Sequence, residues 1–99
     1  MPGKRLHKVQ KEEEKVNRKY IERKLTSNDP KWREIKKAVK ENFKGTEKED
    51  FIKLRYEKKM DVIPICIKMS ISQTTYYKWR EDILNYAMLQ AAHKHMIDI

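Results

Sequence analysis

The sequence predicts an all-α protein, a small helical bundle of four to five helices with a helix-turn-helix at its C-terminal end. The 99 residues fit one small domain, or one domain with a tail, and their Lys, Glu and Ile content favours helices. The chain holds only 2 Gly and 3 Pro, too few for the turns of a many-stranded barrel or sandwich. With 38% hydrophobic and 9% aromatic residues, it is too apolar for full disorder, and with 39% charged residues it is too charged for a membrane protein.

Cysteine usage and hydropathy narrow the class further. Cys66 is the only cysteine, which excludes an internal disulfide framework and a cysteine-based zinc finger. A reducing, cytoplasmic setting is therefore expected. No apolar run approaches the roughly 18 residues that a membrane span requires, and the basic N-terminus lacks the apolar core of a secretory signal.

The net charge of +9 is unevenly distributed along the chain. Residues 1–29 have a net charge of +4, residues 30–59 of +5, and residues 60–99 of zero. A basic chain of this size indicates a polyanionic partner, most often nucleic acid, although a solvated lysine-rich surface is an equally good explanation of charge alone.

Two helices are expected in the basic half. The first covers about residues 8–26, and the second follows a break, with Asp29 as N-cap and Pro30 at the first helical position. An apolar stripe on the second helix has spacings of three and four and predicts core residues Trp32, Ile35, Val39 and Phe43. Gly45 is expected to end this helix.

Three further helices are expected after Gly45. Thr46 and Glu49 form a capping-box pattern at the start of a helix over about 47–58. Asp61 can cap a short helix in the apolar run 60–71, on which Val62, Ile65, Cys66 and Met69 share a face. After a tight turn at 70–72, Ser72 can cap a long helix.

The succession of a helix, a short helix, a three-residue turn and a longer helix over residues 47–90 is typical of a helix-turn-helix. In such a motif the N-terminal residues of the last helix enter the major groove. Short polar side chains are needed there, and amide, hydroxyl and basic groups follow Ser72. The predicted base-reading residues are Gln73, Thr74, Thr75, Tyr77 and Lys78. Tyr76 and Trp79 are expected in the core; a capped surface turn is the alternative for the whole segment.

The run from Met69 to Arg80, Met-Ser-Ile-Ser-Gln-Thr-Thr-Tyr-Tyr-Lys-Trp-Arg, resembles the C-terminal motif of phage transcriptional regulators of the ArpU and RinA type. Phe51-Ile-Lys-Leu-Arg-Tyr56 is similar to the helix that precedes the motif in those proteins and in sigma factor region 4. The resemblance covers about residues 46–90 and implies a DNA-binding helix-turn-helix in a phage or prophage regulator. The run Val62 to Ile67 departs from the pattern, because it lacks the alanine-rich helix common in the family.

Other basic residues are candidates for phosphate contacts. They are Lys36, Lys37, Lys40, Lys44 and Arg80. A solvated helix face is the alternative for the lysines. No metal site is expected, because His93 and His95 are two residues apart and do not share a helix face. No catalytic triad, carboxylate pair or phosphate loop is visible, so neither an enzyme nor a cofactor is expected.

Together these patterns predict a sequence-specific DNA-binding transcriptional regulator of a phage or mobile element, with double-stranded DNA as its partner. A basic N-terminal helix or arm (1–29) would precede a helical DNA-binding domain (30–99), whose helix-turn-helix lies at about 60–90. The alternative is an interaction module that docks on RNA polymerase or another transcription factor without reading DNA. A homodimer is also expected, formed through an apolar stripe of Leu84, Ala87, Met88, Ala91, Ala92 and Met96 that a small core would leave uncovered.

Overall fold

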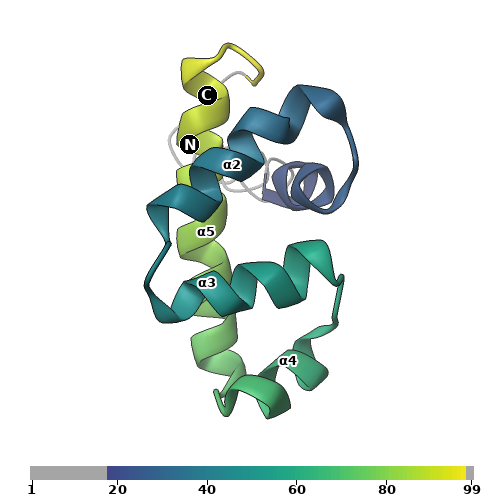
Figure 1. The fold of residues 1–99 in the computed structure, drawn as a ribbon, viewed down its shortest axis with the longest axis vertical. Helices are drawn as coiled ribbons and strands as arrows, with labels where there is room; N and C mark the ends of the chain where they lie inside the picture. Colours follow the sequence, from purple (N-terminus) through teal and green to yellow (C-terminus); the bar gives the residue numbers. More distant parts are fainter. Residues whose placement is uncertain (1–17, 98–99) are drawn as a thin grey trace, which may run out of the picture.

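The computed structural model describes residues 18–97, so the expected start of the first helix lies outside the described residues. Residues 18–26 are helical and are followed by η1 (Pro30–Trp32), α2 (Arg33–Asn42), α3 (Glu47–Ile52), η2 (Lys53–Glu57), α4 (Val62–Met69) and α5 (Gln73–His93) (Figure 1). No strand occurs in the described residues, and the predicted all-α bundle is confirmed. None of the helices in this part of the chain is long and apolar enough to cross a membrane.

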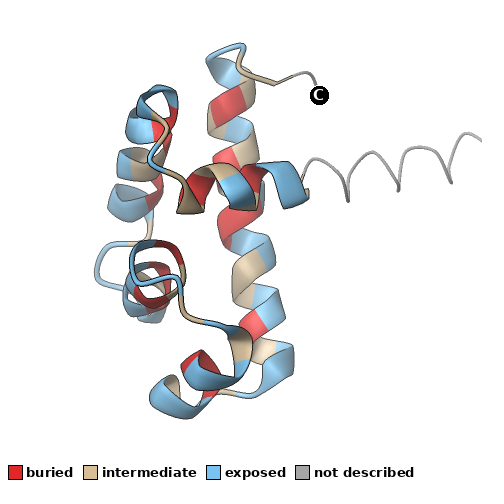
Figure 2. Cartoon of the chain, turned by 90° about the vertical axis from the view of Figure 1, so that its right-hand side faces the viewer, coloured by how far each residue is buried: buried red, intermediate tan, exposed pale blue. Residues whose placement is uncertain are grey.

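The long helix α5 is the axis of the bundle (Figure 1). Helix α2 packs along its C-terminal half, and α4 contacts its N-terminal end. The buried side chains of α5 recur at helical spacing along one face: Tyr76, Ile83, Leu84, Ala87 and Ala91. Figure 2 shows this buried face turned toward the other helices.

Side-chain N-caps mark where η1, α3 and α5 begin. The Asp29 carboxylate accepts the Lys31 N–H at 3.0 Å, and the Thr46 hydroxyl accepts the Lys48 N–H at 3.2 Å, so both residues are N-caps as the sequence predicts. Glu49 differs from the predicted capping box, because its carboxylate accepts the Gly45 N–H at 2.8 Å and not the Thr46 N–H. Gly45 has a φ of 78°, which lets the chain turn between α2 and α3. Asp61 differs from the prediction, because it occupies the N-cap position of α4 but its side chain accepts no capping hydrogen bond.

The helix expected over 47–58 is not regular. It is α-helical only to Ile52, and residues 53–57 form the π-helical turn η2. The wider turn closes when the Lys58 N–H donates to the Lys53 carbonyl at 2.9 Å. No proline or glycine marks this position in the sequence, so the change of helix type is invisible in the residue pattern.

Residues 18–29 belong to the same packed unit as the chain that follows. Ile21 and Leu25 are buried in the common core, and the Tyr20 and Trp32 rings meet edge to face at 6.0 Å. Residues 18–29 therefore share one hydrophobic core with the helices that follow them.

Glu22 links three elements of this unit. Its carboxylate accepts a hydrogen bond from Arg55 of η2 at 3.2 Å and another from Arg80 of α5 at 2.5 Å. All three side chains are shielded, with exposed fractions of 17% to 23%. Burial, with the Glu22 carboxylate nearby, also raises the pKa of Tyr56, which keeps its phenol protonated.

The apolar stripe on which the expected homodimer rests is covered within the chain. Leu84, Ala87 and Ala91 have no exposed surface, because they face the core that α2 helps to form. Met88 and Met96 are half-buried against the same core. The premise that a small core leaves this stripe open is wrong, since the basic N-terminal helices provide enough apolar surface to close it.

Replacing Glu22 with Gln should lower the free energy of unfolding by about 1–3 kcal/mol, because two shielded guanidinium groups would lose their counter-charge. Urea denaturation of both proteins measures the difference. Glu41→Gln on the exposed side of α2 is the matched control and should change stability by less than about 0.5 kcal/mol. Equal effects of the two substitutions would contradict the assigned role of Glu22.

Candidate nucleic-acid interface

Helix α4, the turn after it and the start of α5 form the predicted helix-turn-helix (Figure 1). Ser70 ends α4 in the left-handed conformation, with a φ of 54°. The Ile71 N–H then donates to the Cys66 carbonyl at 3.0 Å, and Ile71 packs half-buried against the core. The left-handed backbone of Ser70, this hydrogen bond and the packing of Ile71 together set the direction in which α5 leaves the turn.

The inner face of α4 agrees with the sequence prediction. Ile65 and Cys66 are buried, and Val62 and Met69 pack half-buried against the core. The sequence did not predict which apolar side chains of α4 would be exposed, because the run is apolar on all sides of the helix. The opposite face leaves Ile63 51% and Ile67 74% exposed.

Ser72 caps α5 as predicted. Its hydroxyl oxygen accepts the Thr75 N–H at 3.1 Å, and the two hydroxyl groups are also 3.1 Å apart in a hydrogen bond. Thr75 is half-buried, so its side chain supports the cap rather than pointing freely into solvent.

Four of the five predicted base-reading side chains form one exposed group on the first turns of α5. We call Gln73, Thr74, Tyr77 and Lys78 the reading face; all four are exposed. The Tyr77 ring is 51% exposed and contacts the buried Tyr76 ring edge to face, with 5.1 Å between the ring centres. This contact restricts the position of the Tyr77 ring. The reading face thus presents amide, hydroxyl, phenol and ammonium groups together at the N-terminal end of α5.

The predicted phosphate contacts fall into two groups. Lys36 donates to the Ser27 carbonyl, Lys40 pairs with Glu57, and Arg80 is held by Glu22. These three cations therefore point toward other parts of the fold. Lys37 and Lys44 are exposed and form no ion pair within the described residues.

The aromatic side chains expected in the core are not all equally buried. Trp32 and Tyr76 are 2% and 1% exposed, as predicted. Phe43 and Trp79 are only half-buried, and the Lys48 ammonium lies 5.9 Å and 5.8 Å from their ring centres. Lys48 is close to Phe43 along the chain but distant from Trp79, so no residue pattern indicates the contact with the Trp79 ring.

Within the described residues, no group of three or more His, Cys, Asp or Glu side chains is arranged to hold a metal ion. His93 ends α5, and His95 lies beyond it in a left-handed turn with a φ of 56°.

Removing the cap hydroxyl in Ser72→Ala should lower the free energy of unfolding by about 1 kcal/mol and speed amide exchange in the first turn of α5. Thr74→Ala is the control, because Thr74 is exposed and its hydroxyl caps nothing. Denaturant melts and hydrogen exchange measure the effects. A Thr74 variant as destabilised as the Ser72 variant would refute the cap assignment.

Comparison with known proteins agrees with this geometry. A helix-turn-helix family described as transposase matches residues 37–98, which include α3, α4 and α5. No curated protein and no solved structure matches the chain. The match supports the DNA-binding motif expected from the phage-regulator resemblance, but in a different family. The chain belongs to the helix-turn-helix transposase family and carries that family's DNA-binding helix-turn-helix.

Proposed function

We propose that this protein is a sequence-specific DNA-binding protein of a mobile element and that it inserts the first turns of α5 into the major groove. The observation that carries the proposal is the reading face, an exposed polar group on a capped helix directly after the helix-turn-helix turn. Side chains at this position of the motif face base edges when the helix enters the groove.

Each member of the reading face suits a separate contact. The Gln73 amide can bond adenine through two hydrogen bonds, and the Thr74 methyl group can touch a thymine methyl group. The Tyr77 hydroxyl and the Lys78 ammonium lie further along the helix, within reach of bases or phosphates. Thr75 contributes by holding the Ser72 cap.

Phosphate contacts are assigned to exposed cations that form no ion pair or side-chain hydrogen bond among residues 18–97. Lys68 is exposed on α4 next to the turn, and Lys37 and Lys44 are exposed on and after α2. Lys36, Lys40 and Arg80 are left out, because each is engaged elsewhere.

The family match favours a mobile element as the source of the protein, and the proposal therefore includes recognition of the element's own DNA. Regulation of transcription by the same contact, as the phage-regulator resemblance implies, uses the same reading face. The chain's own part in either process is to select a DNA site.

Docking on RNA polymerase or another transcription factor is the second candidate function. The observation in its favour is the outer face of α4, where Ile63 and Ile67 expose apolar surface. The buried positions of Leu84 and Ala87 exclude the α5 stripe as the docking surface. If substitutions on the reading face leave DNA binding unchanged while Ile67→Ser abolishes activity, docking is the better explanation.

Gln73→Ala should reduce discrimination between a selected duplex and random duplex by about 1–3 kcal/mol, because one base would lose its bidentate partner. The selected duplex comes from a random pool enriched on the wild-type protein, and titrations with both duplexes give the ratio. Gln90→Ala, near the other end of α5, is the matched control and should keep the wild-type ratio. A wild-type ratio for the Gln73 variant would contradict base reading.

Of the two contacts within reach of Lys78, we assign its ammonium to a phosphate. Lys78→Ala should therefore weaken binding to every duplex alike and lower the slope of log affinity against log salt by about 0.9, the value for one released counterion. Titrations at two or more salt concentrations measure the slope. Lys94→Ala is the control, about 24 Å further along the helix axis, and should leave the slope unchanged. The proposed function fails altogether if the wild-type protein binds no duplex at low salt.

A further inference from the structure

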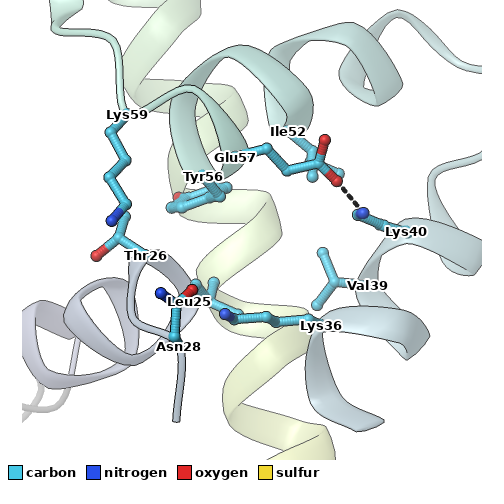
Figure 3. A pocket seen from close by; sticks show the side chains of 10 residues that line it. All are labelled: Leu25, Thr26, Asn28, Lys36, Val39, Lys40, Ile52, Tyr56, Glu57 and Lys59. Carbon is cyan, nitrogen blue, oxygen red and sulfur yellow. Dashed lines mark ion pairs between the residues drawn. The ribbon is translucent and has the colours of Figure 1, made fainter. Parts of the chain in front are cut away.

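A pocket of about 490 Å³ opens between residues 25–28, α2 and η2 (Figure 3). Its floor is apolar and is formed by Leu25, Val39, Ile52 and the Tyr56 ring. The volume lies within the range of small-molecule sites.

The rim of the pocket is basic. Lys36, Lys40 and Lys59 all line it, with Glu57 as the one acidic residue, so the pocket has an excess of two positive charges. Glu57 pairs with Lys40 at one side (Figure 3). Neither Lys36 nor Lys59 forms an ion pair with a carboxylate among the described residues. Lys36 donates one hydrogen bond to the Ser27 carbonyl, and its ammonium has two further donors.

The two remaining lysines are close enough to affect one another. Burial lowers the pKa of Lys36, and the charges of Lys59 and Lys40 lower it further, whereas the Asp29 carboxylate raises it. Lys59 projects from a residue with a φ of 56° between η2 and α4, and Asn28 adds an amide on the same side of the pocket (Figure 3). A bound anion would relieve this repulsion and accept hydrogen bonds from these groups.

The pocket is separate from the reading face, because no residue of α4 or α5 lines it. A ligand bound in this pocket would therefore not contact the residues that we propose read duplex DNA.

We propose that this pocket binds a phosphate monoester with an apolar or aromatic body, the class that includes nucleoside monophosphates. The phosphate lies between Lys36, Lys59 and the Asn28 amide, and the body lies on the apolar floor. A phosphate monoester carries about −1.5 to −2 charges at neutral pH, which matches the excess of two positive charges. A carboxylate carries only one, and inorganic phosphate leaves most of the volume unfilled.

The test is a titration of the full chain with thymidine monophosphate, followed by calorimetry and by chemical shifts of the backbone amides. We expect saturable binding, with shifts at residues 25–28, 36 and 56–59. Thymidine, which lacks the phosphate, and inorganic phosphate, which lacks the body, should each bind at least about tenfold more weakly, because each loses one set of contacts. Nucleoside binding equal to that of the monophosphate would overturn the proposal.

The variant Lys36→Gln with Lys59→Asn removes both pocket charges that have no carboxylate partner, and asparagine tolerates the left-handed backbone of position 59. It should weaken thymidine monophosphate binding by at least about tenfold. Lys53→Gln with Lys58→Gln removes the same charge from exposed residues outside the pocket and should bind as the wild type does. An equal loss in both variants, or no saturable binding to the wild type, would refute the pocket assignment.

A single-stranded thymidine oligonucleotide with a 5′-phosphate serves as a further arm. Shifts at the same pocket residues would support the same chemistry, with a strand end as its source. If the oligonucleotide shifts only the reading face while thymidine monophosphate still binds the pocket, the pocket takes the free monophosphate and not a strand end.

Discussion

Packing against one face of α5 orients the whole bundle. Helices α2 and α4 contact this helix, Phe51 of α3 packs on its Tyr76 ring at 5.0 Å, and Arg80 ties it to residues 18–26. Because side chains on a helix point in fixed directions, burial of Tyr76 at the core determines that Tyr77 faces solvent. The reading face is therefore positioned by the core and not by the turn alone.

The contact made by Glu22 extends this constraint to the N-terminal part of the chain. It joins η2 and α5, which are adjacent in the fold but distant in sequence, to a helix that has a strongly charged surface. Docking of that helix supplies Ile21 and Leu25 to the core and places residues 25–28 opposite η2. The pocket beside η2 exists only because this docking takes place.

Features that depend on neighbours in sequence could be predicted, and features that depend on distant partners could not. The caps at Asp29, Thr46 and Ser72 follow from bonds that span two or three residues, and helical spacing identified the buried face of α2. Glu57 and Glu22 engage Lys40 and Arg80 across the fold, and no pattern in the sequence reveals such pairs. For the same reason, the sequence did not predict that the apolar stripe of α5 would be buried, because its burial depends on helices far upstream.

The distribution of engaged cations changes what the net charge of +9 implies for DNA binding. Lys24, Lys40, Lys48 and Arg55 already have acidic partners within the fold. On the reading face Lys78 is the one cation, beside three uncharged polar residues. Salt-dependent affinity grows with the number of phosphates neutralised, whereas discrimination between sites grows with base contacts. The reading face therefore contributes more to the choice of a DNA site than to the strength of binding. For this reason the positive charge excess of residues 1–59 is a poor measure of how selectively the protein binds DNA.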